Sequence, residues 1–294
     1  MESNLRTVLS SCAAVFGLLA FAWIYSRRAR PDYSGTLRLG MDLLVPCLAF
    51  TSILDSRIDP RMFATAAGAT AIQITVGFLG GLLLLRMTGW RDRRDLLLPI
   101  AFVNSANLPF PLLLANFGAD GLSIGVVCYT VTNLAIYPAG ILLLRERKEL
   151  RCAWREPALW ATAAAGLVRL FHIALPEALL AAARIAAAGA VPIMLILFGD
   201  SLARTHPRAL RLALPAVAVR YLTGLIALVL TLTFLRPTGL LRPILILYAL
   251  LPPAMVNVIL VRNANRDEQA TAAAVLIGTL LAVGILPAVL YFAR

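Results

Sequence analysis

The sequence is poor in charged side chains and in histidine. Charged residues make up 14% of its 294 residues, whereas about 25% is typical of a soluble domain. The two histidines, His172 and His206, lie near the ends of apolar segments, and neither has a second ligand at a metal-binding spacing. No HExxH sequence is present, nor any set of Ser, His and Asp typical of a hydrolase. We therefore expect no metal site, no cofactor and no enzymatic activity.

Cysteines are few as well. Cys12, Cys47, Cys128 and Cys152 show no pair spacing suited to a metal or redox centre. Three of them lie inside apolar segments, where cysteine behaves as a small hydrophobic residue.

Apolar residues dominate the composition. They form 60% of the chain, and the mean hydropathy is +0.83. A helix needs about 20 apolar residues to cross a bilayer. Ten segments approach this length, namely 7–26, 37–54, 62–86, 96–117, 121–144, 157–175, 178–199, 209–235, 241–261 and 269–292. We predict an all-α integral membrane protein with ten transmembrane helices, surrounded by the lipid bilayer.

The basic residues indicate the orientation of these helices. The net charge of +12 does not point to nucleic acid, because Lys and Arg form short clusters between apolar segments. Of 27 such residues, 18 lie in alternate connections and 8 lie on the opposite side. The richer side should be cytoplasmic, so we expect both termini on the non-cytoplasmic side. Arg27 and Arg28 follow the first apolar segment where a cleavage site would stand, so we expect a retained span, in a bacterial inner (plasma) membrane.

The fourth apolar segment contains a polar and proline-rich centre. Its residues 104–111 read Asn-Ser-Ala-Asn-Leu-Pro-Phe-Pro. Prolines remove backbone donors and clash with the preceding turn, so we expect the helix to break there. Broken backbone at membrane depth is tolerated only where protein or a water-filled cavity covers it. We therefore predict that this break forms half of a solute-binding site.

A weak internal repeat predicts a second break. At an offset of about 147 residues, Gly77 matches Gly224 and Thr132 matches Thr279. Residues 1–147 and 148–294 would then each hold five helices, and an odd number makes the repeat inverted, as in many secondary transporters. Pro252 and Pro253 lie near the centre of the ninth segment. Two half-helices would begin at the midplane, and their N-termini favour an anion.

Several stretches resemble the auxin efflux carrier family. The run 104–112, Asn-Ser-Ala-Asn-Leu-Pro-Phe-Pro-Leu, is similar to the signature of that family's fourth helix, and 116–121 is similar to the loop after it. Residues 251–257, Leu-Pro-Pro-Ala-Met-Val-Asn, resemble the broken ninth helix. Residues 274–281 through Pro287 resemble the tenth helix, and 44–48 resemble the second.

The resemblance implies a fold of the bile-acid-symporter type, with helices 4 and 9 crossing at their breaks. Helices 1, 2, 6 and 7 would form a scaffold, and helices 3, 4, 5, 8, 9 and 10 a moving transport unit. The implied function is elevator-type transport of small organic anions, either auxin-like monocarboxylates or dicarboxylates such as malate and malonate. Ala106 and Pro109 stand where the family favours glycine, and these bulkier residues should narrow the site or shift the break.

Five candidate substrate-binding residues lie at the two breaks: Asn104, Asn107, Pro109, Pro253 and Asn257. Each asparagine would either contact the solute or satisfy backbone groups that the break leaves free. Asn133, in the fifth segment, would either support the site or bond across helices.

Arg220, in the eighth segment, is a charged residue near the middle of a span. Such a residue normally faces a cavity or a partner. It would replace the cation that sodium-coupled relatives of this fold hold near the crossover, bind the substrate carboxylate, or serve structure alone by snorkelling or pairing with Asp42. The repeat matches Arg220 with Gln73. Asp42 would carry a proton or lie solvated at the interface.

Three alternative functions remain. A non-transporting sensor or accessory protein could use the same fold, a sodium-coupled symporter would use it differently, and a channel is disfavoured by broken helices. Small-residue runs at 161–166 and 181–190 allow close packing, either inside the protein or in a homodimer through the scaffold helices.

Overall fold

The computed structural model describes residues 2–57, 59–144, 156–205 and 209–293. These ranges are helical apart from short connections, and no strand occurs within them. Within these ranges, seven helices are long and apolar enough to cross a membrane. The protein is therefore an all-α integral membrane protein, as the hydropathy predicts.

The helices follow the ten apolar segments in order. Their bounds are α1 Glu2–Ala29, α2 Ser34–Leu39, α3 Val45–Asp55, α4 Pro60–Thr88, α5 Leu97–Ala101, α6 Pro109–Leu144, α8 Pro157–Leu170, α9 Glu177–Ala203, α10 Leu210–Leu230, α11 Leu241–Ala249, α12 Val256–Asn263 and α13 Gln269–Ala293. Five-residue π-helices, η1 (Gly40–Leu44) and η4 (Thr231–Leu235), join α2 to α3 and extend α10. Within α6, Gly118 has non-helical φ 66° and ψ −159°, which separates the fourth and fifth predicted segments.

The difference between ten predicted segments and seven long helices has a simple origin. A spanning helix needs about 20 residues, whereas α8 has 14, α11 has 9 and α12 has 8. The fourth and ninth segments are each divided by an interruption, residues 102–108 and 250–255, and α6 joins the end of the fourth segment to the fifth. Counting only helices of spanning length therefore gives fewer spans than counting apolar segments of the sequence.

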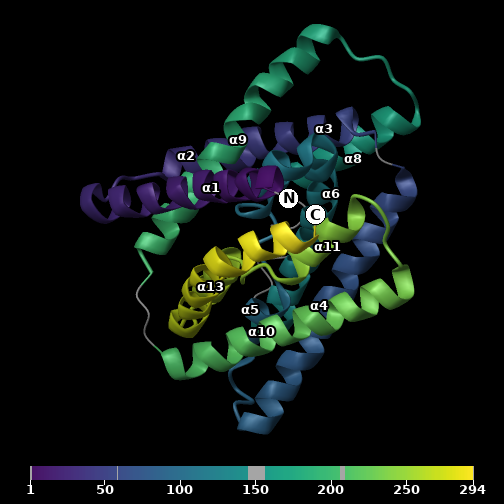
Figure 1. The fold of residues 1–294 in the computed structure, drawn as a ribbon. Coiled ribbons are helices and arrows are strands. Elements are labelled where there is room, and N and C mark those ends of the chain that lie inside the picture. The colour runs from purple at the N-terminus through teal and green to yellow at the C-terminus, as the bar shows by residue number, and fades with distance from the viewer. Residues whose placement is uncertain (1, 58, 145–155, 206–208, 294) are drawn as a thin grey trace.

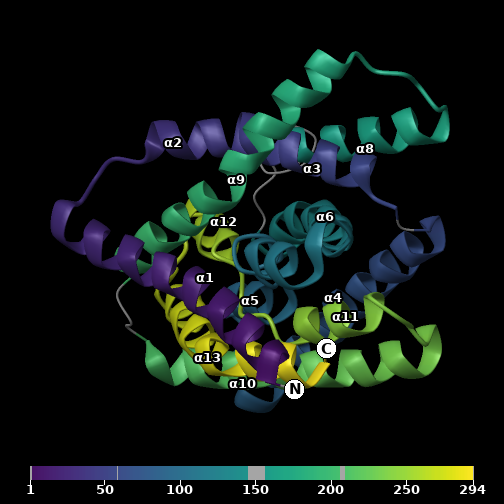
Figure 2. The ribbon, with the colours of Figure 1, turned by 45° about the horizontal axis from the view of Figure 1, so that its top comes forward.

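The helices pack in two groups, which Figures 1 and 2 show from two directions. In one group α1 lies along α9, and α3 lies along α8 and α9. In the other, α4 packs against α10, α5 and α6, and α10 packs against α13. Helix α6 lies between the two groups in Figure 2 and also contacts α3 and α8.

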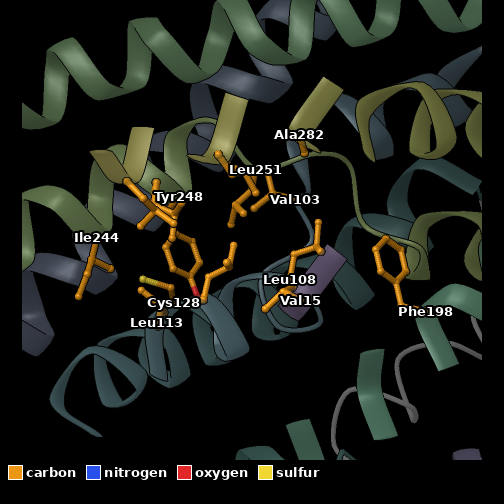
Figure 3. Packing of buried hydrophobic residues seen from close by; sticks show 14 of the residues in the cluster. Val15, Val103, Leu108, Leu113, Cys128, Phe198, Ile244, Tyr248, Leu251 and Ala282 are labelled. Carbon is orange, nitrogen blue, oxygen red and sulfur yellow. The ribbon is translucent and has the colours of Figure 1, made fainter. Parts of the chain in front are cut away.

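The largest buried cluster lies where both interruptions meet α6. Val103 and Leu108 from the first interruption pack in it with Leu251 from the second and with Tyr248 from the end of α11 (Figure 3). The Tyr248 hydroxyl donates to the carbonyl of Ser105 at 2.9 Å and also lies 3.1 Å from the carbonyl of Gly125. This side chain ties α11 to the first interruption and to α6.

Two glycines let long helices approach the interruptions closely. A Cβ on Gly77 of α4 would lie 2.7 Å from Cα of Ala101, the last residue of α5. A Cβ on Gly224 of α10 would overlap the carbonyl oxygen of Ala249, the last residue of α11. Each helix end is thus held against a neighbour that has no side chain at the contact.

Candidate functional site

The two interruptions pair with each other through their backbones. The amide N–H of Asn104 donates to the carbonyl of Pro252 at 2.8 Å, and that of Ala254 donates to the carbonyl of Phe102 at 3.1 Å. Val103 and Pro253 thereby form an isolated antiparallel bridge. Hydrogen bonding between the two segments satisfies part of the backbone that each break would leave exposed inside an apolar layer.

A cavity of about 390 Å³ lies beside this pairing. The five consecutive residues 103–107 form one wall, and Ala254, Met255 and Val256 begin another. Side chains from η1, α6, α9 and α12 complete it, including Tyr129, Tyr137, Met194, Phe198 and Asn263. Ligand pockets commonly measure about 300–1,000 Å³, so the space suits a small molecule.

Two buried amide donors on the cavity wall have no partner. The side chains of Asn104 and Asn133 are 3% and 8% exposed, and the Nδ2 atom of each makes no hydrogen bond within the described chain. A buried polar group without a partner costs about 1–3 kcal/mol. Both residues line the cavity, although the two Nδ2 atoms are themselves buried, so an acceptor group of a ligand that reached them would remove this cost.

Asn104 also shapes the first interruption. Its Oδ1 accepts a hydrogen bond from the backbone N–H of Asn107 at 3.0 Å, so the acceptor end of the amide holds the turn before α6. Asn107 is half-buried and lines the cavity. Asn104 therefore holds the backbone through its oxygen, while its nitrogen has no partner within the described chain.

The other candidates at the breaks lie behind this wall. Asn257 is fully buried, does not line the cavity, and donates from Nδ2 to the carbonyl of Phe102 at 3.0 Å. Pro109 is the first residue of α6, where its missing N–H costs little. Pro253 takes part in the bridge to Val103. In this conformation these three residues support the interruptions rather than line the cavity.

Arg220 and Gln73 meet at the C-terminal end of α11. Arg220 is 1% exposed, and its Nη2 donates to the carbonyl of Ala249 at 3.0 Å. Gln73 donates from Nε2 to the carbonyl of Tyr248 at 2.9 Å. A cation at a helix C-terminus interacts favourably with the free carbonyls there. Arg220 does not line the cavity and has no acidic partner among the described ion pairs.

Asp42 lies apart from this arrangement. It is exposed in η1, on the turn next to Met41, which does line the cavity. The structure thus brings Asn104, Asn107 and Asn133 together, and it places Gln73 and Arg220 at a neighbouring helix end.

Sequence reasoning missed three residues around the cavity. Tyr129 and Tyr137 line it from α6, and both hydroxyls lie near the carboxylate of Glu156, at 3.2 and 3.4 Å. The available signal was the spacing of two tyrosines eight residues apart, which places them on one face of a helix. Glu156 itself read only as the end of a polar connection, because nothing in the sequence pairs it with those tyrosines.

Comparison with known proteins agrees with this architecture. No curated protein matches the chain. A family model described as membrane transport protein matches residues 11–153 and 146–290, nearly the whole length. The predicted likeness of the chain to the auxin efflux carrier family is thereby confirmed. The chain belongs to this family of membrane transport proteins, that of the auxin efflux carriers.

Proposed function

We propose that the protein is a secondary active transporter of small organic anions, with its binding site in the cavity beside the two paired interruptions. The supporting observation is the pair of unpartnered, buried amide donors, Asn104 and Asn133, on the cavity wall. The N-terminus of α12 lies at the same wall, and helix N-termini favour anions. No acidic side chain is among the described residues that line the cavity.

The proposal includes ten spans arranged as an inverted repeat of residues 1–147 and 148–294. The packing of the helices supports this repeat. In it, α1 corresponds to α8 and α9 to α3, so the α1–α9 contact has its counterpart in the α8–α3 contact. Likewise, the α10–α13 contact has its counterpart in the α4–α6 contact, and all four contacts are extensive. The glycines at the helix ends also correspond, because Gly77 and Gly224 match at the repeat offset and contact the ends of α5 and α11. The interruptions would then form the crossover.

An elevator mechanism follows from where the cavity lies. One part of its wall is formed by η1 and α9, which belong with the group of α1, α3, α8 and α9. The other part is formed by α6, α12 and the interruptions, which belong with the second group. We propose that the first group is the scaffold and the second the transport unit. By the charge rule, the lining parts of η1, α6, α9 and α12 belong to the cytoplasmic halves of their spans. With this orientation, the proposed state is an inward-facing one with both termini outside.

The cavity favours a monocarboxylate over a dicarboxylate. Its described lining contains no Lys or Arg, while Met41, Met194, Met255 and Phe198 form much of the wall. A second carboxylate would meet these apolar side chains without a counter-charge, and burying an uncompensated charge is costly. One carboxylate at the asparagines with an apolar body against the methionines and Phe198 fits the lining better.

Arg220 supports a sodium-independent mechanism. Its guanidinium already donates to a carbonyl at the end of α11, which is the kind of oxygen ligand that a sodium ion would otherwise recruit. We propose that it replaces such an ion. Direct binding of substrate is less well supported, because Arg220 is outside the cavity lining.

Proteoliposome uptake tests the proposal. Purified protein is first screened by thermal shift against benzoate, indole-3-acetate, malonate and malate. It is then reconstituted, and exchange and net uptake of labelled compounds are measured under imposed proton and sodium gradients. We expect the aromatic monocarboxylates to stabilise the protein and to be exchanged without sodium.

Each other outcome identifies a different function. Binding without exchange would indicate a sensor or accessory protein, strict sodium dependence would contradict the role of Arg220, and transport of malonate or malate alone would reverse the substrate order. Binding of none of these anions would overturn the proposal.

A further inference from the structure

Glu156 is a buried carboxylate next to the cavity that the transport proposal has not used. It directly precedes α8 and is 7% exposed. Its Oε1 lies 3.2 Å from the hydroxyl of Tyr129, and its Oε2 lies 3.4 Å from the hydroxyl of Tyr137. Both tyrosines belong to α6 and line the cavity. The carboxylate is thus one side chain away from the solute space.

The contact joins the two groups of helices. Glu156 belongs to the group of α1, α3, α8 and α9, whereas the tyrosines belong to α6, which packs with α4. Three other described side-chain hydrogen bonds between these groups are neutral: Asn116 to Ser11, Ser123 to the carbonyl of Ser52, and Thr130 with Thr162. The N–H of Arg57, just after α3, also donates to the carboxylate of Asp120 on α6, but that contact is exposed. The contact at Glu156 is therefore the buried one that changes charge when a proton binds.

The surroundings favour the neutral form of this carboxyl group. Burial raises the pKa of Glu156, and Asp42 raises it further, while the hydrogen bonds from Tyr129 and Tyr137 oppose the shift. These two tyrosines on α6 and Asp42 on η1 are the titratable groups that face it within the described chain. Arg169, on the same helix, instead donates to the carbonyl of Ile53.

We propose that Glu156 is the proton-binding site of the transport cycle and that proton binding there is coupled to transport of the organic anion. The inference rests on the proposed anion transport. When ionised, the carboxylate accepts from both tyrosines and its charge opposes a second negative charge in the cavity. Taking up one proton from the cytoplasm forms an O–H bond, removes that charge and leaves a carboxyl group that donates one hydrogen bond.

Linkage then gives the direction of coupling. If protonation favours anion binding, anion binding favours protonation by the same factor. The proton also changes the hydrogen bonds between α6 and α8, so its release would accompany movement of one group past the other. We expect anion affinity to fall as pH rises, with about one proton taken up per anion bound.

The main test compares the wild type with Glu156→Gln, which mimics the protonated group. Benzoate binding is measured between about pH 5.5 and 8, where the probe itself stays ionised, and proton uptake is followed with a pH-sensitive dye. Reconstituted protein is then tested for benzoate exchange and for accumulation driven by a pH gradient. We expect the variant to bind and exchange benzoate in a way that no longer depends on pH, and to lose proton uptake and gradient-driven accumulation.

Matched controls separate this role from a structural one. Asp42→Asn removes an exposed carboxylate nearby and should keep gradient-driven accumulation. Tyr129→Phe or Tyr137→Phe removes a donor to the ionised carboxylate, so the pH midpoint of binding should rise by about one unit. These variants keep the proposal testable if Glu156→Gln does not fold.

Three results would overturn the inference. One is wild-type binding that does not change with pH, another is gradient-driven accumulation retained by Glu156→Gln, and the third is an unchanged midpoint in both tyrosine variants. Failure of the wild type to bind or exchange benzoate and the other carboxylates would instead overturn the proposed function, and the inference with it. A readout without substrate is thermal stability, which should fall as pH rises through the raised pKa of Glu156 in the wild type and not in Glu156→Gln.

Discussion

At the first interruption, the consecutive residues 103–107 line the cavity, whereas at the second only Ala254 and Met255 do so before α12 begins. The first interruption contains a buried, unpartnered amide nitrogen, Asn104 Nδ2, on a residue that lines that space. Near the second interruption, the polar side chains of Gln73 and Arg220 instead donate hydrogen bonds to the last two carbonyls of α11. The two segments contribute similarly to the backbone pairing, but the side chains at the first lie at the cavity, whereas those near the second satisfy backbone carbonyls.

The comparison shows how a repeated architecture can acquire one binding face. If both interruptions kept the same side-chain chemistry, the cavity would have two equal polar walls. Instead, carbonyl groups freed at the second interruption are satisfied by Gln73 and Arg220, and ligand-directed donors gather at the first. Gln73 of α4 and Arg220 of α10 match at the repeat offset of 147, but both donate to carbonyls of α11. The asymmetry between the two halves therefore extends to the long helices α4 and α10.

Asn104→Asp should have the largest effect on anion binding, because it changes the polar side chain that distinguishes the first interruption from the second. The replacement keeps an oxygen that accepts from the N–H of Asn107, so the turn remains, but it removes the Nδ2 donor and adds a negative charge to the cavity wall. A lost donor to a charged ligand costs about 1.5–3 kcal/mol, and repulsion adds to it, so we expect anion affinity to fall about 100-fold or more. Benzoate binding and exchange measure the effect.

The control for added charge is Asn265→Asp, at an exposed position outside the cavity lining. It should bind benzoate as the wild type does. If Asn104→Asp bound as tightly as that control, the first interruption would not be the anion-binding wall.

Gly224→Ala and Gly77→Ala compare the two helix ends. A Cβ at position 224 would overlap the carbonyl oxygen of Ala249, and one at position 77 would press on Cα of Ala101. Overpacking of this kind costs about 1–3 kcal/mol. We expect both variants to melt at lower temperature in detergent, with Gly224→Ala the more affected because it also crowds Arg220 Nη1, 2.8 Å away.

The matched control is Gly166→Ala, where a Cβ would meet no heavy atom within 4 Å. Its melting temperature should stay the same or rise slightly. If Gly77→Ala and Gly224→Ala melted like this control, close contact would not be what holds the ends of α5 and α11.

Much of this architecture was predictable because it follows from local rules. Proline pairs at 109 and 111 and at 252 and 253 indicate that the two apolar segments are each broken near these residues, since proline lacks an N–H and clashes with the preceding turn. Apolar length and basic clusters give the helical segments and their expected orientation. Asn104, Asn107 and Asn133 could be named because polar side chains inside apolar segments are few.

What the sequence could not give depends on contacts between distant residues. The partner of Arg220 is a backbone carbonyl, and every residue has one, so no side chain marks Ala249 as the partner. Glu156 lies 27 residues after Tyr129, and only the packing of α8 on α6 brings them together. Asn257 was a reasonable site candidate by composition, but its amide is used by the carbonyl of Phe102.

Gln73→Leu should have the smallest of these effects, a modest loss of stability, and it tests whether the second interruption acts only on structure. It removes the donor to the carbonyl of Tyr248, which remains buried against α4, and an unpaired buried carbonyl costs about 1–2 kcal/mol. Because Gln73 serves the second interruption and does not line the cavity, the loss should lower the melting temperature and leave benzoate affinity unchanged. Thr75→Val, at an exposed position on the same helix, provides the control for removing a polar group from α4. A fall in affinity without a fall in stability would mean that the second interruption also acts on the ligand, and the division of roles between the two segments would then be wrong.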